Sequence, residues 1–143
     1  MAEKILLDRF KTALRKEGLK ITSQRIAVLE EVLKAKGHRP SEDIYMAIKV
    51  RKTNVSRATV YRTLDILVQS GFARKMTLGD GGAKYETKIN SPHHDHLICT
   101  ECGDIMEFMD EDIERIQDEI AKKFKFNLQK HIHQLFGVCK KCQ

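Results

Sequence analysis

The sequence lacks the features that mark membrane-spanning, secreted and common zinc-dependent catalytic proteins. No charge-free run of about 18 apolar residues occurs in its 143 residues, which excludes a membrane-spanning helix. The first ten residues, M-A-E-K-I-L-L-D-R-F, are charged throughout and lack a signal-peptide core, so we expect a cytoplasmic protein. No H-E-x-x-H or H-x-E…P-C-x-x-C arrangement is present, and the sequence therefore does not favour a zinc hydrolase or deaminase. We expect no enzymatic activity.

Cysteines are few, and their placement indicates metal binding. In a reducing compartment, four cysteines are more typical of metal ligands than of two disulfide bonds. All four, with five of the six histidines, lie from residue 91 onward, where 7 Lys and Arg stand against 10 Asp and Glu. Residues 1–90 hold 19 Lys and Arg against 10 Asp and Glu. The basic first part suggests a polyanionic partner, most simply nucleic acid.

Apolar periodicity and end signals predict four helices before residue 72. Thr22 or Ser23 can cap the second helix, Ser41 is expected to cap the third, and Ser56 opens the fourth. A hairpin is predicted to follow, with strands in F-A-R-K-M-T-L and A-K-Y-E-T joined by the glycine turn G-D-G-G. Helices followed by a basic hairpin predict a winged helix-turn-helix domain. Its Arg74, Lys75 and Lys84 would lie near a phosphate backbone.

The fourth predicted helix has a buried apolar stripe on one side and a basic polar face on the other. The N-terminal end of that face presents Arg57, Tyr61 and Arg62, and we include Thr59 among the candidate DNA contacts. Arginine can pair with guanine edges or phosphates, and a tyrosine ring can pack on a thymine methyl. The face therefore suits a helix that enters the major groove. For an isolated helix, solvated arginines beside a Tyr61 at the core edge are the simpler interpretation, and the hairpin shifts the balance to DNA binding.

Two C-x-x-C pairs predict a closed structural zinc site with ligands Cys99, Cys102, Cys139 and Cys142. A folded segment must bridge the two pairs. The motif I-M-E-F is expected to be a strand, residues 110–124 a helix, and N-L-Q-K-H-I-H-Q-L-F-G-V-C a returning strand. A sheet of this size leaves an edge to pair, so a dimer formed by this domain is plausible.

The stretch S-P-H-H-D-H holds more ligands than the cysteine site needs. If it runs into a strand, His94 and His96 point one way while His93 and Asp95 point the other way, which suggests two further metal sites. Glu107 could join the first pair, and Glu114 with His131 could join the second. For Glu114 and His131 a solvated surface position is equally open, and nothing beyond its spacing from His131 singles out His133.

These motifs together resemble the ferric uptake regulator (Fur) family. The likeness runs in order from about Leu14 to Cys142 and is carried by G-L-K-I-T-x-x-R, H-R-P-S-E-D-I-Y, A-T-V-Y-R-T-L, H-H-D-H-L-I-C-x-x-C-G and the final C-x-x-C. It implies a metal-dependent repressor that binds an AT-rich inverted-repeat operator as a homodimer or tetramer. The implied fold is α+β, with a winged-helix domain over residues 1–87 and a small α/β dimerisation domain over residues 88–143.

The resemblance also implies ligand sets and DNA contacts. The regulatory metal site would use His38, Glu86, His94, His96 and Glu107, and an additional site would use His93, Asp95, Glu114 and His131. Lys20 would lie near the minor groove, with Tyr61 and Arg62 in the major groove. The regulatory ligands would then come from both domains, so that a bound metal would fix one domain against the other.

Fe²⁺ is the effector that the resemblance implies, beside a structural Zn²⁺. Mixed His and carboxylate ligands also suit Mn²⁺ or Zn²⁺. Peroxide-sensing relatives tend to carry aspartates where this chain has Glu86 and Glu107, so the two glutamates favour an iron sensor. A zinc-uptake or peroxide-sensing regulator stays open, as does a metal-buffering protein of another class.

Overall fold

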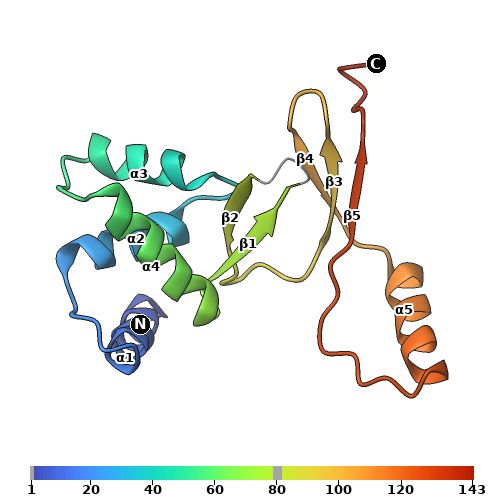
Figure 1. Cartoon of the computed structure of the whole chain (residues 1–143), viewed down its shortest axis with the longest axis horizontal. Coiled ribbons are helices and arrows are strands. Elements are labelled where there is room, and N and C mark those ends of the chain that lie inside the picture. The colour runs from blue at the N-terminus through green and yellow to red at the C-terminus, as the bar shows by residue number, and fades with distance from the viewer. Residues whose placement is uncertain (1, 79–81) are drawn as a thin grey trace. The chain divides into compact units, whose positions relative to one another are not determined.

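The computed structural model describes residues 2–78 and 82–143, which divide into two compact units after Ser91. The first unit holds four helices and a hairpin, and the second holds a small sheet and one helix (Figure 1). No helix of the described residues is long and apolar enough to cross a membrane.

The helices of the first unit begin and end close to the sequence signals. They are α1 (Ala2–Lys16), α2 (Ser23–Lys34), α3 (Ser41–Val50) and α4 (Arg57–Gln69). The Thr22 side chain accepts a hydrogen bond from the Arg25 amide, and Ser56 accepts one from Thr59, so both residues cap as predicted. The prediction for Ser41 is wrong. Ser41 is already the first helical residue, and Pro40 occupies the N-cap position without a side-chain capping hydrogen bond. Proline suits the start of a helix because it has no backbone N–H that would need a partner there.

A single apolar core stabilises the first unit. Phe10 from α1 packs edge-to-face on Phe72, with ring centroids 6.0 Å apart, and the α4 stripe lies between α1, α2 and α3. The buried cluster consists of Phe10, Leu14, Val28, Leu29, Val32, Ile44, Ile48, Val55, Val60, Leu64, Ile66, Leu67, Phe72, Ala73 and Tyr85. Because α4 contributes four of these side chains, its polar start is held in a fixed orientation by the core beneath it.

The predicted hairpin is confirmed as an antiparallel pair of β1 (Ala73–Thr77) and β2 (Ala83–Thr87). The predicted glycine turn falls mainly on residues 79–81, which lie outside the described residues. Arg39 exchanges two backbone hydrogen bonds with Tyr85, at 3.0 and 2.7 Å. This bridge ties the segment before α3 to the hairpin.

The second unit consists of a three-stranded sheet of order β4-β3-β5 and one helix, α5 (Figure 1). Along the chain, α5 lies between the second and the last strand of this sheet. Strand β3 (Asp95–Cys99) lies in the middle, antiparallel to β4 (Ile105–Phe108) and parallel to β5 (Gln134–Gly137). Helix α5 (Glu111–Lys123) connects the two edge strands. The returning strand is shorter than predicted: residues 127–133 are not strand, because pairing with β3 begins at Gln134.

The second unit buries little by itself. Among its described residues only Asp95, Ile98 and Cys99 are buried. Helix α5 has no buried residue, although Ile116, Ile120 and the following Phe124 are apolar. A unit of this size without a core needs another source of stability, such as a metal ion or a second subunit.

Candidate metal centres and nucleic-acid interface

The four cysteines meet at one end of the sheet. Cys99 closes β3, Cys102 lies in the following turn, and Cys139 and Cys142 form a second turn just after β5. Each turn is closed by a backbone hydrogen bond of 3.0 Å, from Gly103 to Cys99 and from Cys142 to Cys139. Gly103 has a φ of 76°, a conformation that favours glycine.

The spacing of the cysteine sulfurs fits a zinc ion. Cys139 Sγ lies 3.7 Å from Cys102 Sγ and 3.6 Å from Cys142 Sγ. A tetrahedral centre with Zn–S bonds of about 2.3 Å separates its sulfurs by about 3.8 Å. These two spacings are close to the tetrahedral value, and all four sulfurs lie within 4.8 Å of one another.

Backbone amides prepare Cys99 to bind a cation. Hydrogen bonds from the amides of Cys102 and Cys139 to the Cys99 sulfur lower the pKa of that thiol to about 6. The sulfur of Cys139, and after it that of Cys102, raises the pKa of Cys142 to about 12. At neutral pH the metal-free cluster therefore holds a Cys99 thiolate beside a protonated Cys142, and because the pKa of Cys102 is also raised, binding of zinc by all four sulfurs would release the protons of both Cys102 and Cys142.

A second cluster contains His93, Asp95, Glu114 and His131. Asp95 Oδ1 lies 3.4 Å from His93 Nε2 and 3.5 Å from His131 Nε2. Glu114 Oε1, in the first turn of α5, lies 3.6 and 3.3 Å from the same two nitrogens. Four donor atoms from a strand, a helix and two loops thus face one point.

Two observations show that this cluster is suited to a cation. Tetrahedral bonds of about 2.0–2.1 Å to nitrogen and oxygen separate neighbouring ligands by about 3.4 Å, close to the observed spacing. Within the described chain, Asp95 Oδ1, Glu114 Oε1 and His131 Nε2 are buried without a hydrogen-bond partner. Buried polar atoms are seldom left in this state, and a shared ion would satisfy all three.

The remaining predicted ligands form pairs within each unit. In the first unit, His38 Nε2 lies 3.0 Å from Glu86 Oε2, because the Arg39–Tyr85 bridge sets the two residues side by side. In the second unit, His94 Nε2 lies 3.3 Å from Glu107 Oε1. The His94 and His96 rings are neighbours, with centroids 4.9 Å apart. The grouping of His94 with His96 and of His93 with Asp95 is the one that strand alternation predicts.

The N-terminal face of α4 is exposed, as a groove-reading surface requires. Tyr61 is 49% exposed on a helix that is otherwise anchored in the core, and Arg62 beside it is exposed. Thr59 is half-buried and its amide donates to Ser56 Oγ. Lys20, in the loop before α2, is exposed.

Two arginines of the basic surface are engaged within the first unit. The Arg57 guanidinium donates to both carboxylate oxygens of Glu42, at 2.8 to 3.2 Å, and lies over the Tyr45 ring. The hydrogen bond from Arg57 lowers the pKa of Glu42. Arg74 donates to the backbone oxygen and hydroxyl of Ser91, at 2.7 and 3.2 Å. Arg74 is thus hydrogen-bonded within its own unit, whereas Lys75 is exposed and Lys84 is half-buried on the hairpin.

Comparisons with known proteins agree with this arrangement. The sequence matches the ferric uptake regulator family over residues 16–136. It is 46% identical over 140 residues to the ferric uptake regulation protein of Campylobacter jejuni, which covers 96% of this chain and 88% of that protein.

Solved structures confirm the predicted α+β fold. The Helicobacter pylori ferric uptake regulator, described as having three functional metal binding sites, matches with a TM-score of 0.87 at 34% identity, over 97% of this chain and 92% of that one. The Francisella tularensis ferric uptake regulator with iron matches with a TM-score of 0.78 at 30% identity, over 87% and 95% of the two chains.

Proposed function

The chain belongs to the ferric uptake regulator family and is a metal-responsive transcriptional regulator, and on this premise we propose that Fe²⁺ is its corepressor. The relatives of Campylobacter jejuni and Helicobacter pylori are named ferric uptake regulation proteins, which favours iron over other effector metals. The observation that carries the proposal is that each unit holds an imidazole–carboxylate pair, His38 with Glu86 and His94 with Glu107. These are the ligands that Fe²⁺ accepts, although Mn²⁺ and Zn²⁺ bind the same groups.

The regulatory site in this proposal takes ligands from both units. His38 and Glu86 supply two, and His94, His96 and Glu107 supply three. Sharing one ion between these groups would hold the two units in one relative orientation, and so fix the spacing of two α4 helices in a dimer. Without the ion, few orientations would match two half-sites. A near-complete shift of this kind needs roughly 5 kcal/mol of differential binding, which one multidentate metal site can supply.

The other two ligand sets have different tasks. Cys99, Cys102, Cys139 and Cys142 are proposed to hold a structural Zn²⁺, supported by sulfur spacings of 3.6 and 3.7 Å. The additional site is proposed to consist of His93, Asp95, Glu114 and His131, supported by their buried unpartnered atoms.

The DNA-reading surface is proposed to be the start of α4. Tyr61 and Arg62 would enter the major groove of an AT-rich inverted-repeat operator, with Thr59 beside them and Lys20 reaching toward the minor groove. Arg57 would join them only by exchanging its Glu42 partner for a phosphate or base. The core under α4 supports this assignment because it leaves the polar side of the helix exposed.

The second copy of the chain is proposed to cover the apolar surface of the second unit. Leu135 and Phe136 on the edge strand β5 are 45% and 49% exposed, and Phe124 after α5 is 73% exposed. An edge strand with apolar side chains pairs readily with another chain, and a strongly apolar surface needs cover. A homodimer built on β5 and α5 would give this unit the burial that it lacks alone.

The test is an anaerobic fluorescence-anisotropy titration of zinc-loaded protein on an AT-rich inverted-repeat duplex. Addition of Fe²⁺ is expected to raise the affinity at least a hundredfold in the wild type, which takes about half of the roughly 5 kcal/mol available. His38→Ala and Glu107→Ala should each abolish this rise. Glu119→Ala, a carboxylate exposed on α5 whose partner is Arg115, is the matched control.

The outcomes separate the candidate functions. Equal DNA affinity with and without metal would refute the corepressor role. A response to Mn²⁺ or Zn²⁺ but not to Fe²⁺ would keep the regulator and replace its effector. Loss of DNA binding on exposure to peroxide would identify a peroxide sensor, which Glu86 and Glu107 argue against.

A further inference from the structure

Asp95 presents its two carboxylate oxygens to different partners. Oδ1 faces His93 and His131, the nitrogen ligands of the proposed additional site. Oδ2 is buried too, and within the described chain it has no hydrogen-bond partner. If Oδ1 binds a cation, Oδ2 stays in a buried place where water does not solvate it, because the side chain is 1% exposed. Such an oxygen requires a donor.

His133 is the residue placed to supply that donor. Its Nδ1 lies 3.7 Å from Asp95 Oδ2 and, like Oδ2, is buried without a hydrogen-bond partner within the described chain. The histidine is held on both sides: its backbone oxygen accepts from the His96 amide at 3.1 Å, and its ring packs edge-to-face on Phe108. Phe108 is the β4 residue directly opposite Asp95 in the sheet.

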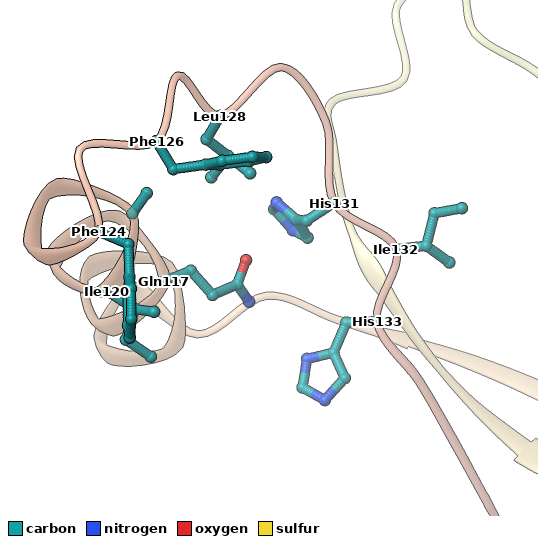
Figure 2. Close-up of a pocket in the computed structure, with 9 residues that line it drawn as sticks. Gln117, Ile120, Phe124, Phe126, Leu128, His131, Ile132 and His133 are labelled. Atoms are coloured by element: carbon teal, nitrogen blue, oxygen red, sulfur yellow. The ribbon is translucent and has the colours of Figure 1, made fainter.

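The local geometry explains why two histidines reach the same aspartate. Residues 131–133 run extended ahead of β5, and Figure 2 shows His131 and His133 on one side of this segment with Ile132 on the other. Alternation places both imidazoles beside Asp95, where His131 contacts Oδ1 and His133 contacts Oδ2. The Gln117 side chain points toward the same two imidazoles across the cavity (Figure 2).

We propose that His133 is a positioning residue for the additional metal site: its Nδ1–H donates to Asp95 Oδ2 and so presents Oδ1 to the ion. This proposal rests on the proposed metal site. Outer-shell donors of this kind orient a ligating carboxylate, and their loss lowers metal affinity by about 10- to 100-fold. The Nδ1–Oδ2 separation must close from 3.7 Å to about 2.9 Å when the ion binds, a small rotation of either side chain.

His133 is assigned to position the aspartate and not to bind the ion. His93 and His131 each lie within 3.6 Å of Glu114 Oε1 as well as near Asp95 Oδ1, so they enclose the ion position. His133 lies on the far oxygen of Asp95, and within the described chain its carboxylate contact is with Asp95 alone. A ligand would have to face Oδ1 and Glu114.

The experiment compares three variants of His133 in the full chain, with its Cys site loaded with zinc and with His96→Ala present, so that the regulatory site does not contribute. His133→Asn places an amide N–H where Nδ1 stands, whereas His133→Gln places it near Nε2 and His133→Leu removes it. Competitive Zn²⁺ titration is expected to show affinity near that of the parent for the Asn variant, and a loss of about 10- to 100-fold for the Gln and Leu variants.

A spectroscopic measurement separates positioning from ligation. Long-range ¹H–¹⁵N NMR of the zinc-loaded parent should show His133 protonated on Nδ1. A deprotonated, metal-bound Nδ1 would overturn the proposal, as would unchanged affinity in both His133→Leu and His133→Gln or equal losses in all three variants.

A ligand variant keeps the two proposals apart. His131→Ala should remove binding at this site altogether. If it leaves Zn²⁺ binding unchanged, the metal site itself fails. If it abolishes binding while His133→Leu and His133→Gln do not weaken it, only the role of His133 fails.

Discussion

Removal of the zinc ion that we propose for the cysteine site is expected to unfold the second unit and leave the first unit folded. Ile98 is the one aliphatic side chain buried within the described part of the second unit. Full burial of such a side chain contributes about 1.5–3 kcal/mol. A structural zinc ion contributes about 10–16 kcal/mol of apparent binding free energy at pH 7, so the proposed zinc ion would dominate the stability of this unit. The first unit, with its own cluster of 15 buried apolar residues, does not share that dependence.

Hydrogen-exchange mass spectrometry of the whole protein would measure this difference. The informative amides are His96 and Thr100, which donate to the backbone oxygens of His133 and Gly137 at 3.1 and 2.8 Å and join β3 to the segment of β5. Even a loss of about 4 kcal/mol would shorten their protection about a thousandfold. Peptides from α4 should keep their protection.

Two variants sharpen the test. Cys142→Ser should reproduce the effect of a chelator, whereas Lys140→Ser, an exposed position in the same turn, should behave as the parent. Full protection of β3 in protein shown by mass to be free of zinc would refute the argument. Equal loss of protection in α4 would refute the independence of the first unit.

Three other properties and one surface give further predictions. Below about pH 6, the zinc affinity of the cysteine site should fall more steeply as the pH is lowered, because Cys99 is then protonated too and one more proton is displaced per zinc bound. A chelator competition series would contradict this if the plot of log affinity against pH kept one slope through pH 6. Leu64→Ala should lower the free energy of unfolding by about 2–5 kcal/mol in urea, since Leu64 is fully buried, and a change below 1 kcal/mol would contradict the core assignment. Arg62→Ala should weaken operator binding by about 1–3 kcal/mol in anisotropy titrations, whereas Arg15→Ala, exposed on α1, should not. Phe124→Glu should shift sedimentation toward the monomer, and an unchanged dimer would exclude this surface from the interface.

The sequence determined the features that depend on short stretches of chain. The C-x-x-C spacing indicates two turns that each present two thiolates, because the geometry of such a turn is local. Strand alternation separates His93 and Asp95 from His94 and His96, since successive side chains of an extended chain point to opposite faces. Helix caps at Thr22 and Ser56 follow from hydrogen bonds within three residues. Membership of the family followed from the order of several such motifs.

The tertiary structure decided what joins distant segments. The parallel pairing of β5 with β3 starts at Gln134, a register that no local pattern specifies, and it leaves His131 and His133 in an extended segment ahead of the strand. The same pairing turns His133 toward the second oxygen of Asp95, a contact across 38 positions of sequence. Likewise, Arg57 pairs with Glu42 because α3 packs against α4, so its guanidinium already has a carboxylate partner within the unit. Local patterns fix which residues can act, whereas packing between elements fixes which atoms meet.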